Sequence, residues 1–193
     1  MSGTGNSGGR PNGHAGLHAD AVRLLTGWAA PDRHQEALRH SFLALLAARD
    51  DATARECAPG HLTASAYVLS ADRSRVLLTL HPRVGRWLQL GGHCESGDRS
   101  IADVARREAL EESGLHGLVL DPVPLSVDVH PITCSLGVPT RHFDVNFLLV
   151  APEGAAPVIS DESDDLAFWP VDALPDGVDD SLLSALHRAR LRT

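Results

Sequence analysis

One short segment constrains this chain more than any other, because three glutamates lie close together within it. The segment is Arg107-Glu108-Ala109-Leu110-Glu111-Glu112-Ser113-Gly114-Leu115, and fourteen residues separate it from the glycine pair Gly91-Gly92. Glu108 lies three residues before Glu111 and four before Glu112, so a helix would carry all three carboxylates on one face. Like charges at that spacing repel one another. The pattern therefore predicts a helix that faces a positive group, and clustered oxygen ligands favour a hard divalent cation such as Mg²⁺ or Mn²⁺.

This segment resembles the signature of the Nudix hydrolases, which is a glycine, five residues, a glutamate, seven residues, and then Arg-Glu-apolar-x-Glu-Glu-x-Gly-apolar. The residues that match the pattern are Gly92, Arg107, Glu108, Glu111, Glu112, Gly114 and Leu115. Asp98 replaces the glutamate, and eight residues rather than seven separate it from Arg107. The extra residue falls in the loop or first helical turn, where Asp98 is expected to cap the helix. The spacing within the helix is unchanged.

The resemblance implies an α/β fold, a Nudix-type α/β/α sandwich with a mixed β-sheet, over residues 59–193. Alternating apolar patterns and turn residues predict the strands independently of it. Ser100 is the expected N-cap of the signature helix, and Gly114 is expected to end it in a left-handed conformation. The expected strands cover 63–69, 75–80, 87–90, 125–129, 143–150 and a short edge at 168–169, and a terminal helix covers 181–191.

A helical extension is expected ahead of this domain. Residues 1–16 are rich in Gly, Ser and Asn and are predicted to be flexible. The extension, 17–58, contains a helix at 17–26 and a second from the N-cap Asp32 to about Arg49. We expect the two helices to pack on the main domain and cover apolar surface, with a dimer contact or a substrate lid as alternatives.

Function and site follow from the resemblance. It implies metal-dependent hydrolysis of a pyrophosphate bond in a nucleoside diphosphate linked to another moiety. Glu108, Glu111 and Glu112 would be ligands of Mg²⁺ or Mn²⁺, together with the backbone carbonyl of Gly92. Glu108 is also a candidate base, Glu111 shares the catalytic role, and Arg107 is expected to orient the carboxylates. A later acidic run, 160–165, offers Glu162 as a further metal ligand, although such a run is often only a solvated loop.

Substrate contacts are expected from basic residues around this centre. His93 follows Gly92 directly, and Arg83 and Arg86 precede the strand that leads into it. His142 lies at the end of a variable stretch, with His130 at its start and Asp144 close by. His93, His142, Arg83 and Arg86 are the candidate substrate-binding residues, with ordinary surface or core roles as the alternative.

Composition excludes several other classes of protein. The formal net charge is −8, and all 17 basic residues are arginine, which argues against nucleic acid as a partner. Three cysteines without CxxC spacing indicate neither a disulfide framework nor a cysteine zinc site, which favours a reducing cytoplasm. No apolar run reaches the roughly 18 residues of a membrane helix, and no signal peptide is evident. A small nucleotide-type diphosphate is the expected partner, no membrane is expected to bind, and a homodimer is possible.

Two other functions remain open at this stage. An isomerase of isopentenyl diphosphate on the same fold would need a reactive cysteine, for which Cys94 and Cys134 are candidates. A non-catalytic nucleotide-sensing module with a Nudix fold would bind its ligand without consuming it. The complete carboxylate set favours hydrolysis.

Overall fold

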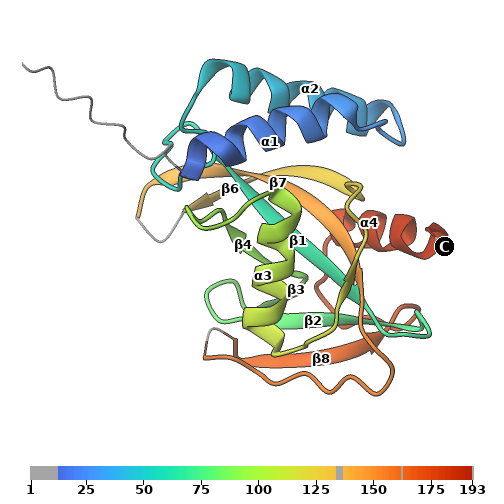
Figure 1. Cartoon of the computed structure of the whole chain (residues 1–193). Coiled ribbons are helices and arrows are strands. Elements are labelled where there is room, and N and C mark those ends of the chain that lie inside the picture. Colours follow the sequence, from blue (N-terminus) through green and yellow to red (C-terminus); the bar gives the residue numbers. More distant parts are fainter. Residues whose placement is uncertain (1–12, 134–136, 162, 193) are drawn as a thin grey trace, which may run out of the picture.

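A curled mixed sheet of eight strands forms the centre of the molecule in our computed structural model, which describes residues 13–133, 137–161 and 163–192 (Figure 1). Strands β1 (His61–Leu69) and β7 (Pro139–Val150) run parallel through its middle, and the other paired strands are antiparallel. The order is β3-β2-β1-β7-β5, with β4 beside β1, β6 beside β7 and β8 beside β2. The remaining strands are β2 (Arg75–His81), β3 (Arg86–Leu88), β4 (Leu90–His93), β5 (Val119–Leu120), β6 (Ser126–Thr133) and β8 (Asp165–Pro170).

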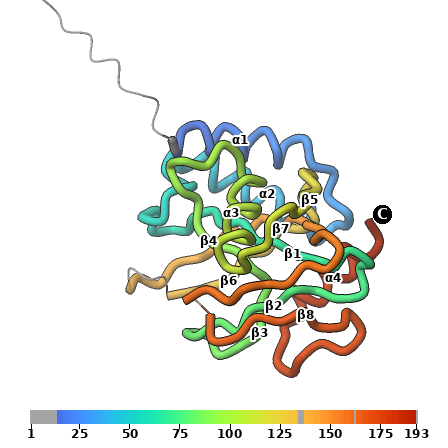
Figure 2. The backbone as a smooth tube through the Cα atoms, turned by 60° about the horizontal axis from the view of Figure 1, so that its bottom comes forward, coloured from blue at the N-terminus to red at the C-terminus, as the bar shows by residue number. Residues whose placement is uncertain are grey.

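Helices cover both faces of the sheet and confirm the predicted α/β/α architecture. Helix α3 (Ile101–Ser113) lies on one face together with α1 (Gly13–Gly27) and α2 (Arg33–Ala48), and their apolar side chains share one core with β1 and β7. Helix α4 (Asp180–Leu191) packs against a second apolar cluster that includes Tyr67 and Leu69. Figure 2 shows α1 and α3 on the near side of the sheet and α4 behind it.

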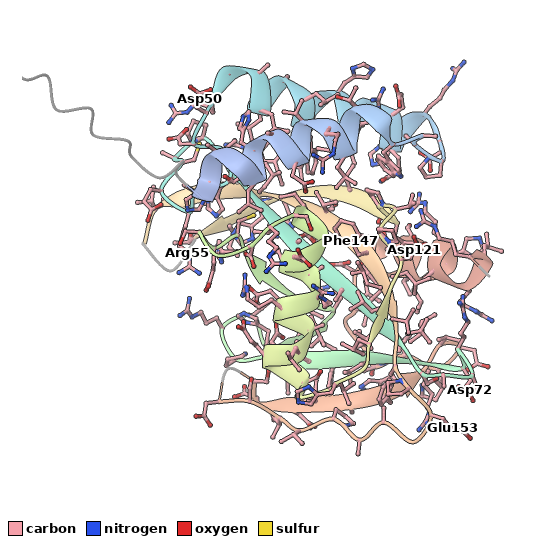
Figure 3. All side chains as sticks on the ribbon, viewed as in Figure 1. Asp50, Arg55, Asp72, Asp121, Phe147 and Glu153 are labelled. Carbon is pink, nitrogen blue, oxygen red and sulfur yellow. The ribbon has the colours of Figure 1, made fainter. Side chains whose placement is uncertain are left out.

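The two N-terminal helices are built into the core, as predicted. Phe42 of α2 meets Phe143 of β7 edge to face, with 5.1 Å between ring centroids. The Gln35 side chain pairs with both backbone groups of Val127, at 2.7 and 3.0 Å, and so extends the hydrogen bonding of β6. Side chains of α1 and α2 fill the space above the sheet (Figure 3). None of the helices in the described ranges has the length and apolar character needed to cross a membrane.

Helix boundaries follow the caps that the sequence indicated. Asp32 accepts a hydrogen bond from the Gln35 amide at 2.9 Å, and so caps α2 as predicted. Helix α1 begins at Gly13, four residues before the predicted start, and therefore includes the last part of the segment expected to be flexible. A tertiary contact accompanies this first turn, because His14 Nδ1 lies 3.3 Å from Thr53 Oγ1.

Helix α3 is anchored at both ends. Ser100 is the N-cap and accepts from the Asp103 amide at 3.0 Å, and Gly114 ends the helix with φ 63°, both as predicted. A contact that the sequence did not suggest adds to this, because Asp20 of α1 accepts a 2.8 Å hydrogen bond from the Ile101 amide. A carboxylate at a helix N-terminus satisfies an open amide and interacts favourably with the helix dipole. The N-terminal helices therefore help to position the helix that carries the signature.

Candidate active site

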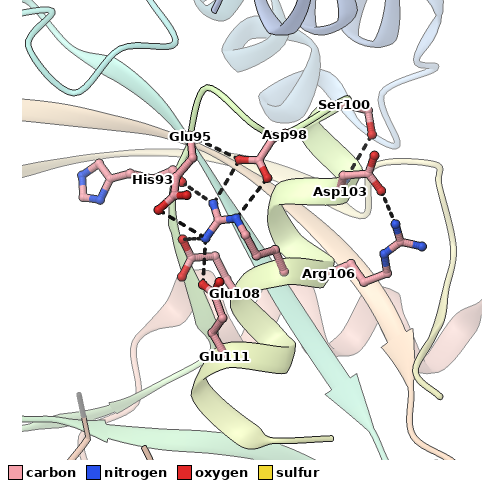
Figure 4. Close-up of polar contacts among 9 residues, drawn as sticks. His93, Glu95, Asp98, Ser100, Asp103, Arg106, Glu108 and Glu111 are labelled. Atoms are coloured by element: carbon pink, nitrogen blue, oxygen red, sulfur yellow. Dashed lines mark hydrogen bonds and ion pairs between the residues drawn. The ribbon is translucent and has the colours of Figure 1, made fainter. Parts of the chain in front are cut away.

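Arg107 forms ion pairs with a cluster of carboxylates on α3 and the loop before it. Figure 4 shows four of these acids, Glu95, Asp98, Glu108 and Glu111. Arg107 Nη1 donates to Glu108 Oε1 at 3.0 Å and to Glu111 Oε2 at 2.9 Å. Its Nη2 donates to the backbone carbonyl of His93 at 2.8 Å, and Glu95 Oε1 lies 4.0 Å from its Nη1. These charged partners raise the pKa of Arg107 against the opposing effect of its burial, so the guanidinium stays positive. Arg107 thus joins helix α3 to the end of β4 and holds two signature carboxylates in place.

Asp98 is the carboxylate that pairs with the other side of the Arg107 guanidinium. Its two carboxylate oxygens accept from Arg107 Nε and Nη2, both at 3.0 Å, in the paired geometry that suits a planar guanidinium. Asp98 Oδ2 also accepts from the Glu95 amide at 2.8 Å. The expectation that Asp98 caps the helix is therefore wrong, since Ser100 fills that position. The loop absorbs the additional residue of the signature and still brings Asp98 to Arg107.

The glycine pair brings the backbone of β4 against two glutamates. A Cβ atom at Gly92 would lie 2.5 Å from Glu108 Cδ and 2.6 Å from its Oε2, so only glycine leaves room for that carboxylate. Next to it, the Gly91 amide donates to Glu112 Oε1 at 2.9 Å. The glycines are therefore needed for close approach, and Glu108 and Glu112 are each held against β4.

The charges and exposure of the cluster fit a bound divalent cation. Glu112 is only 8% exposed and the Glu108 side chain 13%, whereas the Glu111 side chain is 55% exposed. Glu95 and Asp98 add two more carboxylates, and Arg107 is the single cation that the described contacts place among these five acids. An excess of carboxylate oxygens, several of them drawn out of solvent, is the donor set that Mg²⁺ and Mn²⁺ prefer.

Histidines gather on the other side of β4. The rings of His61, His93 and His142 lie 4.9–5.1 Å apart between centroids, and His130 lies 5.3 Å from His142. Figure 4 shows the His93 ring pointing away from Asp98 and Glu108. Burial lowers the pKa of His61, and it lowers the pKa of His93 and of His142 to about 3, so these three imidazoles are neutral.

The register of strands β1, β4 and β7 brings these histidines together, and register between distant strands could not be read from the sequence. His61 pairs with His142 across β1 and β7, and His93 lies opposite Thr63 on the neighbouring strand β4. The structure thus brings together His93 and His142, two of the predicted substrate residues, and adds His61, which sequence reasoning missed. The alternation of His61, Thr63 and Ser65 along one strand face was the available signal.

A buried carboxylate lies two residues further along the strand that carries His142. Asp144 is 2% exposed and accepts from the hydroxyls of Thr63, at 2.8 Å, and Ser65, at 2.7 Å. Burial raises its pKa, although these hydroxyls and the nearby His130 act in the opposite direction. Thr63, Ser65 and Asp144 therefore form a buried polar group on the two strands that also carry His61 and His142.

The two predicted substrate-binding arginines lie at the start of β3 and in the turn before it. Arg86 donates through Nε to the Gly177 carbonyl at 2.7 Å, and Arg83 is exposed in the turn before β3. Glu162, the proposed additional metal ligand, lies outside the described residues.

Comparisons with known proteins identify the family of this chain. Residues 59–188, about two thirds of the chain, match the family described as the NUDIX domain. Among curated proteins, none matches the sequence. The chain therefore belongs to the Nudix family, and it is a Nudix pyrophosphohydrolase, an enzyme that acts on acid anhydrides in phosphorus-containing compounds.

Solved structures share the fold at low sequence identity. The dihydroneopterin triphosphate pyrophosphohydrolase of E. coli has a TM-score of 0.55 at 20% identity, over 68% of this chain and 96% of that one. A NUDIX-family hydrolase from Clostridium perfringens has a TM-score of 0.53 at 20% identity, over 69% of this chain and 98% of that one. A C. elegans Ap4A hydrolase has a TM-score of 0.52 at 16% identity, over 67% and 95%. All three cover a similar share of this chain.

Proposed function

We propose that this chain hydrolyses a pyrophosphate bond in a nucleoside diphosphate linked to another moiety, with Mg²⁺ or Mn²⁺ as its cofactor. The observation that supports this most directly is the arrangement around β4: Glu108 fits against Gly92, and Glu112 accepts from the Gly91 amide. Together with the exposed Glu111, these carboxylates concentrate negative charge beside the backbone of Gly91 and Gly92, where the lack of side chains allows close approach. Such a site suits a cation that also binds a polyanionic diphosphate.

Each residue has a defined part in this proposal. Glu108, Glu111, Glu112 and the Gly92 carbonyl are the groups that would hold the ion, which supplies charge neutralisation and orientation of the diphosphate. Water bonds to one phosphorus, the bridging P–O bond breaks, and Glu108 accepts the proton that the water loses. Arg107 positions Glu108 and Glu111, because one of its nitrogens donates to both.

Substrate contacts are proposed on the neighbouring surfaces. His93 follows Gly92 directly, its ring lies 4.9 Å from that of His142 between centroids, and both residues are half-buried. Arg83 and Arg86 are exposed and would have to turn toward the diphosphate, which for Arg86 means releasing the Gly177 carbonyl. Arginine is well suited to phosphate because its fork of donors matches two oxygens at once.

A buried thiol disfavours the isomerase alternative. Cys94 is 6% exposed, its Sγ lies 3.7 Å from the Leu62 carbonyl, and burial raises its pKa to about 12. A neutral thiol packed in the core is not the reactive cysteine that proton transfer to an alkene would require. Cys134, the other candidate, lies outside the described residues.

A substrate panel tests the proposal. The panel contains NDP-sugars, dinucleoside polyphosphates, ADP-ribose, NADH and nucleoside triphosphates, with Mg²⁺ or Mn²⁺ at alkaline pH, and phosphate is measured with and without an added phosphatase. We expect turnover of one class that is lost with EDTA and in Glu112→Gln. Glu153→Gln, an exposed glutamate in a distant loop (Figure 3), is the matched control and should keep wild-type rates.

The outcome of these assays distinguishes a hydrolase from a nucleotide-sensing module and from an isomerase. Equal turnover in Glu112→Gln and wild type would remove the carboxylates from the mechanism. Binding of a nucleotide without its consumption, in the presence of the metal, would indicate the sensing module instead. Isomerised product from an allylic diphosphate, detected by mass spectrometry, would support the isomerase.

A further inference from the structure

We propose that His61, His93 and His142 form a second metal site, one that binds a single divalent transition metal such as Zn²⁺ or Co²⁺. This site is separate from the carboxylate cluster and does not depend on the proposed hydrolysis, although it uses His93 and His142, which are also the proposed substrate-binding histidines. One ligating atom from each of the three side chains lies within 4.8 Å of the other two. The three residues come from three strands, β1, β4 and β7, so the sheet itself positions them.

The chemistry of the donors selects the class of metal. Imidazole nitrogen is a common ligand of zinc and its neighbours among the transition metals, whereas Mg²⁺ and Ca²⁺ prefer oxygen. Three histidines with a fourth position open to solvent or ligand is an established zinc arrangement. Zinc–nitrogen bonds of about 2.0–2.1 Å place tetrahedral ligand atoms about 3.3 Å apart. Small side-chain rotations would therefore have to bring the three nitrogens closer together.

An unsatisfied buried side chain points to a ligand at this position. His61 is 1% exposed, and in the described part of the chain neither of its ring nitrogens has a hydrogen-bond partner. His142 Nε2 is likewise buried without a partner among the described residues. Buried polar atoms in folded proteins are nearly always satisfied, so unpaired ones require an explanation. A metal ion coordinated among the three rings would satisfy one nitrogen of each ring, and so one of the two unpaired nitrogens of His61.

Arg55 controls access to the cluster. Its Nη2 lies 2.7 Å from His93 Nδ1, and the arginine itself is exposed (Figure 3). The guanidinium can only donate, so in this arrangement His93 Nδ1 is the acceptor and its lone pair is directed at Arg55. For His93 to use this nitrogen as a ligand, Arg55 must turn away into solvent. The positive charge of Arg55 also opposes a second cation, so removal of the side chain should strengthen metal binding.

The two metal sites would lie on opposite sides of β4. Gly92 faces Glu108, whereas the His93 ring faces His61 and His142. The His93 carbonyl accepts from Arg107, so a metal on His93 would also stabilise the strand end that carries the active-site glycine. Metal binding to the folded state alone raises the melting temperature.

Cobalt spectroscopy tests the site directly. The full chain, prepared without a polyhistidine tag and stripped of metal, is titrated with Co²⁺ while visible absorption is recorded. We expect one equivalent to give the intense bands of four- or five-coordinate Co²⁺, which Zn²⁺ then displaces. Glu112→Gln should retain these bands, because the carboxylate site provides oxygen ligands and a weakly absorbing octahedral ion.

Variants of the cluster decide the outcome. His61→Gln and His142→Gln should lose the bands and the Zn²⁺-dependent rise in melting temperature, while the exposed control His34→Gln keeps both. Arg55→Ala should bind Co²⁺ more tightly than wild type, by about tenfold or less, as expected for one exposed charge. Circular dichroism confirms that each variant is folded, and His93→Gln provides a half-buried alternative should His61→Gln unfold. Weak octahedral bands only, or intense bands that survive His61→Gln and His142→Gln, would overturn the proposal.

Discussion

A single methyl group at Gly92 should inactivate the enzyme without unfolding it. The Cβ atom of Gly92→Ala would lie 2.5 Å from Glu108 Cδ, whereas ordinary van der Waals contact begins at 3.4 Å. The backbone of Gly92 does not adopt a positive φ, so alanine is tolerated there by the main chain. The Glu108 carboxylate, at the end of a flexible side chain, must therefore move by about 1 Å.

The expected loss follows from this displacement. A misplacement of about 1 Å at a catalytic group reduces rates by roughly 100-fold. The melting temperature should change little, because the glutamate can relieve the clash by rotating. The assay is kcat/KM on the substrate found in the panel, together with a thermal melt of the same preparation.

Two neighbouring glycines serve as controls. At Gly91 a Cβ would lie 2.5 Å from Ser65 Oγ and 2.7 Å from the Ala64 carbonyl, which is backbone and cannot rotate away. Gly91→Ala should therefore lose stability as well as activity. Gly97→Ala, where nothing lies within 4 Å, should resemble wild type. Full activity in Gly92→Ala, or a drop in its melting temperature equal to that of Gly91→Ala, would refute the reasoning.

Three further predictions concern the groups around the site. Arg107→Lys should lower kcat/KM about 100-fold and the free energy of unfolding by about 1–3 kcal/mol. The reason is that a lysine ammonium cannot bond to several carboxylates at once as the guanidinium does. Wild-type kinetics in this variant would contradict the positioning role of Arg107. Asp20→Ala should cost about 1 kcal/mol in urea unfolding by leaving the Ile101 amide without its acceptor, and an unchanged midpoint would contradict this. The Gln35 amide and Arg188 hold the pKa of Asp32 below its ordinary value of 3.8. Wild type should thus be more stable than Asp32→Asn above pH 3.8, and this difference should disappear as the pH falls through the lowered pKa of Asp32. Thermal melts of both proteins at pH 6 and pH 3 measure the difference, and one that persists unchanged in acid would contradict the prediction.

Local patterns predicted much of the active site. Helix α3, its N-cap Ser100 and its C-cap Gly114 were evident because capping and helical periodicity depend on residues a few positions apart. The family resemblance implied that Arg107 orients neighbouring carboxylates, and in the structure its Nη1 donates to Glu108 and to Glu111. The family resemblance then supplied the architecture and the chemical class.

Predictions that relied on a loop or on distant partners were less successful. Asp98 was assigned to the helix cap, but the loop turns it toward Arg107, since a paired guanidinium contact satisfies both carboxylate oxygens. Arg86 stays a predicted substrate contact, and the sequence did not indicate that its side chain donates to the Gly177 carbonyl in the loop before α4. Neither contact can be read from spacing along the chain.

The sequence by itself determined which carboxylates share a helix face, because that depends only on the repeat of the helix and on residues within one turn. Tertiary structure alone decided that Glu108 meets Gly92, that Asp20 holds the start of α3, and that His61 and His142 lie side by side. Those contacts depend on strand register and helix docking between residues that are far apart in the chain.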